Sequence, residues 1–291
     1  MMQTTQTSNS LSKAQIERYW ENGFLCPIPA ISTQQCEDWR AELEAIESDW
    51  LDNGLPRALN VYKRVNAHLV MPLAYEIAAH SAILDVVEGI LGPDVLLYST
   101  EFLIKEPHTK HVVTMHQDLA YWGLGEIDGI LTAWLALTPA TPQSGCMDFV
   151  KGSHKSPIIP HEDSFDELNL LSRGQEIKVN VAEEDKSSGA LATGEMSLHH
   201  GLMIHGSGAN TSDDRRIGVV MRFLSPHVKK PNNAPDYGVA MRGNCDTGNF
   251  TLCHAPKGLF HPEDLLLYEE IRTEQAKVMM AGAEGKAAMY A

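Results

Sequence analysis

The chain has 291 residues, of which 43% are hydrophobic and 21% are charged, as in an ordinary globular protein that buries a sizeable core. Its 23 basic and 38 acidic residues give a net charge of −15 without a long basic run, which argues against a nucleic-acid partner. No apolar run reaches the length of a membrane span, and no apolar signal-peptide core stands near the N-terminus, so we expect no membrane partner.

The cysteine pattern indicates the cellular compartment. The five cysteines are odd in number and scattered, without a C-x-x-C pair. Such a pattern suits reduced thiols better than a disulfide framework or structural zinc, so we expect a cytoplasmic protein. The sequence leaves the oligomeric state open, including a homodimer.

The N-terminal third has helical periodicity. A polar tail of residues 1–10 is predicted to be disordered. Ser12 and Ser32 each stand three residues before a glutamine, a capping-box pattern that predicts a helix after each serine. A further helix is predicted over Pro72–Ile90, ended by a Gly-Pro pair. Residues 11–92 therefore form a helical N-terminal part.

From residue 93 the sequence changes to short runs rich in β-branched and aromatic residues. These runs predict strands at Val95–Tyr98, Phe102–Lys105, Val112–His116, Ile130–Leu137, Cys146–Val150, Ile177–Val181, Met196–His200, Leu202–His205 and Arg216–Leu224. The pattern indicates a mostly β fold with flanking helices, a sandwich or barrel, in one domain over residues 11–291. Its β core spans 93–225 with a lid at about 158–176, and 226–291 holds an irregular segment and a C-terminal helix.

A histidine and a carboxylate stand two residues apart in His116-Gln117-Asp118. On an extended strand both side chains point to the same side, because side-chain direction alternates with period two. With one distant histidine, such a pair forms the 2-His-1-carboxylate triad that binds ferrous iron and leaves the opposite positions open. His205 is the best partner, because a Gly-Ser-Gly turn and an arginine follow it.

Three other histidines compete with His205 for the third position, and a hydrogen-bonded or surface histidine is the favoured interpretation for each: His154, His199 and His200. A basic patch precedes the H-x-D motif, and a solvated face is its favoured interpretation: Lys105, His108, Lys110 and His111.

Several blocks in order resemble the phytanoyl-CoA dioxygenase family: Met115–Trp122, Thr132–Leu137, Ser144–Met147, Gly152–Lys155, and His205–Asn210 followed by Arg216. The resemblance covers about residues 11–225, and the sequence around Gly23 is similar to that family's start. It implies a double-stranded β-helix (a cupin-like jelly roll) that uses Fe(II), O₂ and 2-oxoglutarate as co-substrate.

The same resemblance implies site residues. It implies that the iron ligands are His116, Asp118 and His205, and that Arg216, helped by Ser207, grips the far carboxylate of 2-oxoglutarate. An arginine suits that task because its planar fork forms two charge-assisted hydrogen bonds with a carboxylate. We also expect Thr132 to contact the co-substrate.

The strand pattern alone predicts the opposite orientation for the Arg216 side chain. Along the predicted strand Arg216–Leu224, the row that contains Arg216 and Arg222 is less apolar than the row that contains Arg215, so pattern alone turns Arg216 outward. A strand of a sandwich can be covered on both faces, and the family spacing favours Arg216 over Arg215.

The resemblance implies an oxygenase that hydroxylates a C–H bond and releases succinate and CO₂. Asp118 argues against a halogenase, because halogenases of this fold have a small residue at the position of the metal carboxylate. A non-catalytic ligand-binding or sensor domain is an alternative, which the complete triad and its arginine disfavour.

We expect the substrate to be small, polar and anionic or zwitterionic, such as an amino acid, an ectoine-like compound or an organophosphonate. Five polar or aromatic side chains lie in segments that could surround the iron, and a buried cation calls for an anionic partner, an internal carboxylate included: Tyr121, Trp122, Arg173, Arg222 and Arg64. An acyl thioester is the alternative substrate.

Overall fold

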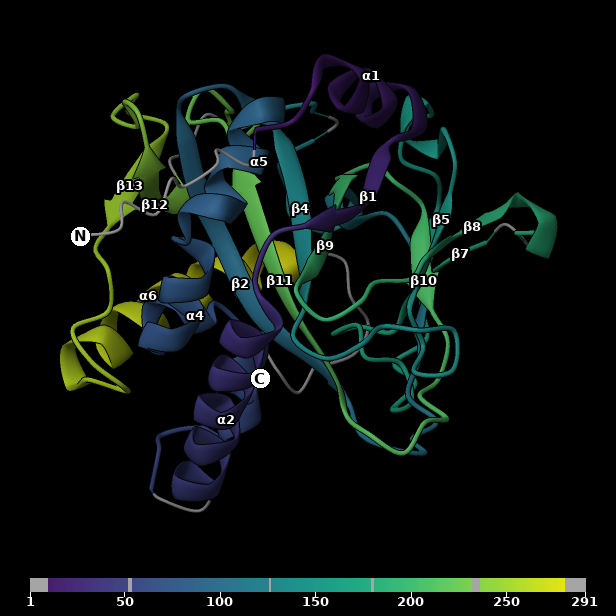
Figure 1. The fold of residues 1–291 in the computed structure, drawn as a ribbon. Helices are drawn as coiled ribbons and strands as arrows, with labels where there is room; N and C mark the ends of the chain where they lie inside the picture. The colour runs from purple at the N-terminus through teal and green to yellow at the C-terminus, as the bar shows by residue number, and fades with distance from the viewer. Residues whose placement is uncertain (1–9, 52–53, 126, 179–180, 232–235, 281–291) are drawn as a thin grey trace, which may run out of the picture.

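The structure, a computed structural model, describes residues 10–51, 54–125, 127–178, 181–231 and 236–280. Its centre is a large sheet with a smaller sheet beside it (Figure 1). The large sheet has the order β1 (Phe24–Pro29), β9 (Glu195–His200), β4 (Ile130–Ala136), β11 (Arg216–Leu224), β2 (Val95–Lys105), β12 (Asp236–Arg242) and β13 (Phe250–Cys253). The small sheet has the order β3 (Val113–His116), β10 (His205–Ser207), β5 (Met147–Val150) and β8 (Lys186–Gly189). This arrangement confirms the predicted mostly β, jelly-roll fold.

Helices flank the sheets: α1 (Lys13–Asn22), α2 (Thr33–Trp50), α3 (Leu59–Arg64), α4 (Pro72–Ala78), α5 (Ser81–Leu91) and α6 (Pro262–Met279). The predicted N-caps are present, since the hydroxyls of Ser12 and Ser32 accept backbone N–H bonds. The single helix predicted over 72–90 is wrong. His80 has an extended backbone (ψ 128°) and its Nδ1 accepts the Ala82 N–H, so its ring caps a second helix.

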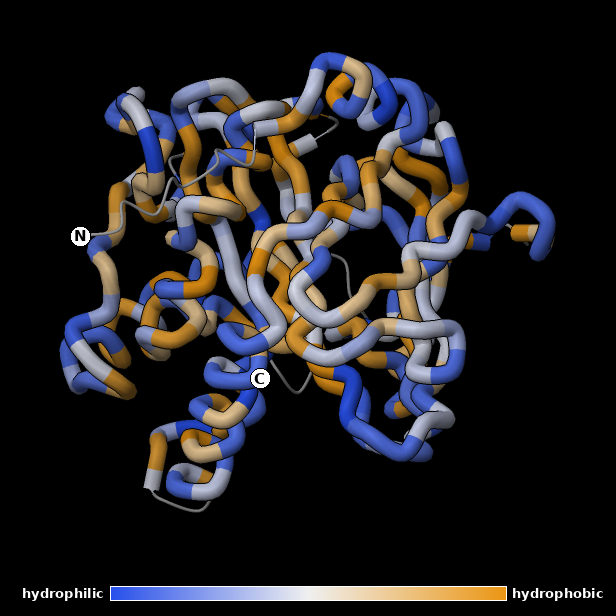
Figure 2. Tube along the Cα trace, in the orientation of Figure 1, coloured by the Kyte–Doolittle hydropathy of each residue, from blue (hydrophilic) through white to orange (hydrophobic). Residues whose placement is uncertain are grey.

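The large sheet is covered on both faces. One row of side chains on β4 and β11 packs with the helices in the main hydrophobic core: Leu131, Ala133, Leu135, Ile217, Val219, Met221 and Phe223. The opposite row, which includes Trp134 and Val220, packs with Met147 and Phe149 of the small sheet. Figure 2 shows hydrophobic stretches in the central strands and hydrophilic peripheral loops. The more apolar row of β11 therefore faces the helices, and the row of Arg216 faces the space between the sheets.

Several strand predictions are wrong in detail, among them Leu202–His205, because β10 begins only at His205. Residues 95–105 form one continuous strand, β2, in place of two. The segment expected to be irregular after residue 225 contains β12 and β13, which extend the large sheet beyond β2. The sequence analysis missed β1 because prolines 27 and 29 disfavour a strand, and they are tolerated because β1 is an edge strand.

The segment expected to be a lid contains an antiparallel hairpin of β6 (His161–Asp163) and β7 (Gln175–Ile177). The predicted disorder of residues 1–9 falls outside the described residues. Among the residues that the structure describes, no helix is long and apolar enough to cross a membrane.

Candidate active site

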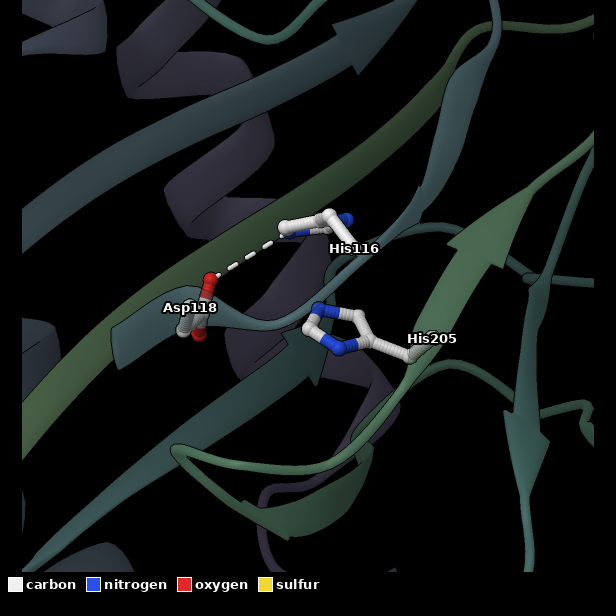
Figure 3. Close-up of side chains that lie close together, drawn as sticks. All are labelled: His116, Asp118 and His205. Carbon is white, nitrogen blue, oxygen red and sulfur yellow. Dashed lines mark ion pairs between the residues drawn. The ribbon is translucent and has the colours of Figure 1, made fainter. Parts of the chain in front are cut away.

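The H-x-D motif and the distant histidine meet in the small sheet. His116 ends β3, His205 begins β10, and the two residues are paired across the ladder. Asp118 lies just beyond β3, at the start of a 3₁₀ turn over Asp118–Ala120. One ligand atom from each of the three side chains lies within 4.8 Å of the others, and all three are buried (Figure 3). These side chains thus offer two imidazole nitrogens and a carboxylate to one point.

Gln117 sets the direction of the two neighbouring side chains. Its backbone is extended (φ −117°, ψ 125°), so His116 and Asp118 point to the same side although Asp118 itself has left the strand. Its buried side chain donates to Leu202 O (2.9 Å) and accepts from the Ile159 N–H (2.9 Å). The peptide between the two side chains is therefore fixed from two directions.

Hydrogen bonds orient both imidazoles in the same way. Nδ1 of His116 lies 2.9 Å from Thr114 O, and Nδ1 of His205 lies 2.9 Å from Met203 O. A backbone carbonyl can only accept, so each Nδ1 carries a proton, and Nε2 is the ring atom that each imidazole can offer to a metal. This arrangement is typical of histidines that ligate a metal through Nε2.

The carboxylate of Asp118 is held in its charged form. Its Oδ2 accepts a hydrogen bond from Thr132 Oγ1 (2.9 Å), and its Oδ1 lies 3.3 Å from His116 Nε2. Burial opposes ionisation, but the neighbouring imidazoles of His116 and His199 and the Arg222 guanidinium outweigh it, and they hold the pKa of Asp118 well below its usual range. Burial together with the neighbouring histidines lowers the pKa of His205. Two imidazoles beside one carboxylate form the donor set that suits a divalent metal.

His199, for which the sequence analysis favoured a hydrogen-bonded or surface histidine, lies in the site. It is 1% exposed, and its Nε2 lies 3.6 Å from Asp118 Oδ2. Its ring centroid is 4.3 Å from that of His205. Within the described residues neither of its ring nitrogens has a hydrogen-bond partner. His199 stands opposite Thr132 across β9 and β4, and this long-range register could not be deduced from the sequence.

The other two competing histidines lie away from the triad. His200 accepts the Leu202 N–H at Nδ1 and its Nε2 lies 3.2 Å from Asp128. His154 is 3.0 Å from Trp20 O. Both therefore fit the interpretation of hydrogen-bonded histidines.

Arg216 is fully buried at the start of β11 and faces the space between the sheets. Its Nη1 donates to Gly145 O (2.9 Å), and its guanidinium lies 5.2 Å from the centroid of the Trp134 ring. Within the described residues, Arg216 Nε and Trp134 Nε1 are buried donors without a hydrogen-bond partner. Burial lowers the pKa of Arg216 to about 10. Leaving such buried donors without an acceptor is costly.

Gly218 makes the position of the Trp134 ring possible. A Cβ atom at Gly218 would lie 2.0 Å from the Trp134 ring, so only glycine leaves room for the indole against β11. Arg215, the neighbour on the opposite face, pairs instead with Glu47 (2.8 Å) and Glu106 (2.9 Å).

The solvated patch predicted around Lys105 is wrong for that residue. Lys105 is fully buried and stands opposite Arg216 in the β2–β11 pair. Its Nζ donates to Ser207 Oγ (2.7 Å), Ser207 O (3.2 Å) and Gly208 O. Burial and the neighbouring Arg216 lower the pKa of Lys105 to about 6. His108, by contrast, is exposed and pairs with Asp213.

A cavity of about 140 Å³ opens onto the three metal-ligand candidates. The residues that line it include Thr132, Trp134, His199 and Ser207, and four of the five predicted substrate contacts: Tyr121, Trp122, Arg222 and Arg64. Arg64 and Arg222 share the buried carboxylate of Glu101, at 3.2 and 2.7 Å. The Arg222 guanidinium also lies 4.9 Å from the centroid of the Trp122 ring.

Arg173, the fifth predicted substrate contact, does not line this cavity. It pairs with Asp163 of β6, donates to Met279 O (2.8 Å) and lies 5.4 Å from the Tyr121 ring centroid. These contacts tie the hairpin segment to the end of α6. Arg173 lines a neighbouring hollow, of which Tyr121 and Val278 are shared walls with the main cavity.

Comparisons with known proteins agree with this geometry. The sequence profile of the family described as phytanoyl-CoA dioxygenase matches residues 19–218. The peroxisomal phytanoyl-CoA dioxygenase of Bos taurus is 27% identical over 244 residues, which cover 76% of this chain and 71% of that protein. A probable alpha-ketoglutarate-dependent hypophosphite dioxygenase of Stutzerimonas stutzeri is 28% identical over 179 residues, 60% of each protein.

Solved structures are similar as well. The apo form of the non-haem monooxygenase ThoJ is 30% identical with a TM-score of 0.81, covering 92% of this chain and 98% of that one. The nickel complex of ThoJ is 28% identical with a TM-score of 0.74, covering 90% and 98%. The chain belongs to the phytanoyl-CoA dioxygenase family and is, by class, a non-haem iron, 2-oxoglutarate-dependent dioxygenase.

Proposed function

We propose that this enzyme hydroxylates a C–H bond of a small polar, anionic or zwitterionic metabolite, and that His116, Asp118 and His205 hold its iron. The observation that carries the proposal is the convergence of two buried imidazoles, each oriented through Nδ1, and one buried carboxylate on one point of the cavity. When bound there, iron supplies the activation of oxygen that is coupled to the oxidative decarboxylation of 2-oxoglutarate to succinate and CO₂. The protein orients the ligands and excludes water.

The second part of the proposal concerns the co-substrate. Arg216 supplies a buried cation, and Trp134 Nε1 supplies a further donor that lacks a partner within the described residues. With Ser207, which lines the cavity, they form the receptor for the far carboxylate of 2-oxoglutarate. A buried guanidinium without a counter-charge is costly, and the carboxylate removes that cost.

Charge and size of the cavity support a small, anionic substrate. Arg64 and Arg222 both line the cavity and share the carboxylate of Glu101, so cationic groups stand on this wall. Lys230 and Asp236, which also line the cavity, form an ion pair at 2.8 Å. A volume of about 140 Å³ is at the small end for a ligand site and favours a small molecule over an acyl thioester.

A panel of amino acids, betaines, aminophosphonates and acyl thioesters tests the substrate class. We expect oxygen consumption matched by succinate release with a member of the first three groups. Matched turnover only with long-chain acyl thioesters would contradict the small-substrate proposal. Metal and 2-oxoglutarate binding without succinate release under any condition would favour the sensor alternative.

Thr132→Val tests how Asp118 is held. The substitution keeps the shape of the side chain but removes the hydroxyl that donates to Asp118 Oδ2. We expect metal affinity to fall roughly tenfold to a hundredfold, as for other hydrogen bonds to metal ligands. Isothermal calorimetry with cobalt(II) measures the metal affinity. Thr138→Val is the matched control, because the Thr138 hydroxyl donates to Arg215 O, a backbone carbonyl. Equal loss in both variants would show a general packing effect.

A further inference from the structure

Two buried basic side chains stand side by side near Ser207, which lines the cavity. Lys105 ends β2 and is directly opposite Arg216 of β11, and both are 0% exposed. Among the described residues, no carboxylate oxygen lies within ion-pair distance of either one. Like charges in a low-dielectric interior repel each other, so burial beside Arg216 disfavours the charged form of Lys105 and lowers its pKa to about 6. An anion that joins the pair favours the ammonium form again.

The contacts of Lys105 converge on one turn. Its three acceptors are Ser207 Oγ, Ser207 O and Gly208 O, all in the residues that follow His205 by two or three positions. An ammonium group has three N–H donors and no acceptor, so these three oxygens match its capacity. Asn210 Nδ2 also donates to the Lys105 carbonyl (3.0 Å), which ties the end of β2 to the same turn.

These contacts fix the direction of the Ser207 hydroxyl. Because the Ser207 oxygen accepts from Lys105, its own hydrogen must point elsewhere, and Ser207 lines the cavity. Within the described residues, Lys105 is the only hydrogen-bond partner recorded for that oxygen. The hydroxyl is thus left as a donor toward the cavity, and the ammonium form of Lys105 behind it strengthens this donor when an anion is bound.

We propose that Lys105 is a positioning residue that selects 2-oxo acids with a second, far carboxylate. It acts by aiming the Ser207 hydroxyl at that carboxylate and, in its ammonium form when the anion is bound, by adding its charge to that of Arg216 behind Ser207. The inference rests on the proposed use of 2-oxoglutarate. It adds that the preference for a dicarboxylic co-substrate comes from a lysine on β2 as well as from the arginine on β11.

The test compares 2-oxoglutarate with 2-oxopentanoate, which carries a methyl group in place of the far carboxylate. Calorimetry on the cobalt(II)-loaded protein under nitrogen gives the affinity for each acid without turnover. The variants are Lys105→Met, Ser207→Ala and the double variant. Lys110→Met, at an exposed lysine of the segment after β2, is the matched control.

We expect Lys105→Met to bind 2-oxoglutarate at least about tenfold more weakly and 2-oxopentanoate unchanged, because a charge-assisted hydrogen bond is lost only for the dicarboxylate. Ser207→Ala should show the same selective loss. In the double variant, the affinity for 2-oxoglutarate should fall by a smaller factor than the product of the factors in the two single variants, because Lys105 acts partly through Ser207. Lys110→Met should bind both acids as the wild type does.

Other results have distinct meanings. Wild-type protein that binds neither acid would overturn the proposed function itself. Wild-type binding of 2-oxoglutarate with unchanged affinity in Lys105→Met, or an equal loss for both acids, would overturn only the role of Lys105. If Lys105→Met does not fold, Ser207→Ala decides alone, because it leaves the buried lysine in place. An unchanged preference for 2-oxoglutarate in Ser207→Ala would then overturn the inference.

Discussion

Alanine in place of His116, Asp118 or His205 is expected to abolish coupled turnover and metal binding. Each substitution removes one of the three ligands that a facial triad requires, so two remaining ligands cannot hold the metal in place. Calorimetry with cobalt(II) measures the loss of metal binding, and succinate release measures the loss of turnover. Circular dichroism should show the wild-type secondary structure, because the ladder between β3 and β10 is formed by backbone atoms.

His200→Ala is the control for this series. His200 is as buried as His205 but is held by Leu202 and Asp128, away from the triad. We expect its metal affinity to stay at the wild-type value. Wild-type affinity in His205→Ala together with a loss in His200→Ala would show that the third ligand is assigned to the wrong histidine.

Arg216→Ala is expected to raise the KM for 2-oxoglutarate by roughly tenfold or more. Loss of a hydrogen-bonded charge pair costs about 1.5–3 kcal/mol, and each 1.4 kcal/mol corresponds to a factor of ten. Arg215→Ala should leave this KM unchanged, because Arg215 faces the other side of β11 and pairs with Glu47 and Glu106. Its partly exposed ion pairs contribute at most about 1 kcal/mol of stability. Steady-state succinate release across a range of 2-oxoglutarate concentrations measures both values. A larger effect of Arg215→Ala would mean that the register of β11 is shifted by one residue.

The strand pattern and the family spacing disagree about Arg216, and the structure shows why. Apolar alternation predicts the buried row of a strand when its other face is solvated, but β11 is covered on both faces. Its more apolar row packs against the helices, and its polar row lines the space between the sheets. Pattern alone therefore identifies the face with the larger hydrophobic contact, which is not the face that carries the site.

Several features that depend only on residues close in sequence were predicted correctly. The serines that cap α1 and α2 and the period-two spacing of His116 and Asp118 depend on neighbouring residues, and each was predicted. The break at His80 was missed because a histidine ring acts there as the helix cap in place of the usual Ser, Thr, Asp or Asn.

The two site residues that the sequence analysis placed elsewhere, Lys105 and His199, depend on long-range pairing. Lys105 looked like part of a surface patch because exposed His108 and Lys110 follow it closely, and only its register opposite Arg216 buries it. His199 adjoins Asp118 because β9 pairs with β4, and the order of strands in a sheet cannot be deduced from a local sequence pattern. The strands β12 and β13 were missed for a related reason, since Pro, Gly and Asn in that segment obscure the alternation that marks a strand.

The anchoring of Gln117 couples the metal site to the hairpin of β6 and β7. Its side chain accepts from Ile159, and its backbone N–H donates to His161 Nε2 (3.0 Å), so the peptide between His116 and Asp118 is fastened to the start of the hairpin. A metal that binds only when His116 and Asp118 are ordered also stabilises the contacts that hold them, including those to the start of the hairpin, by thermodynamic linkage. Metal loading should therefore slow amide hydrogen exchange across 159–163 and protect that segment from proteolysis, while the remote strand β13 exchanges at an unchanged rate.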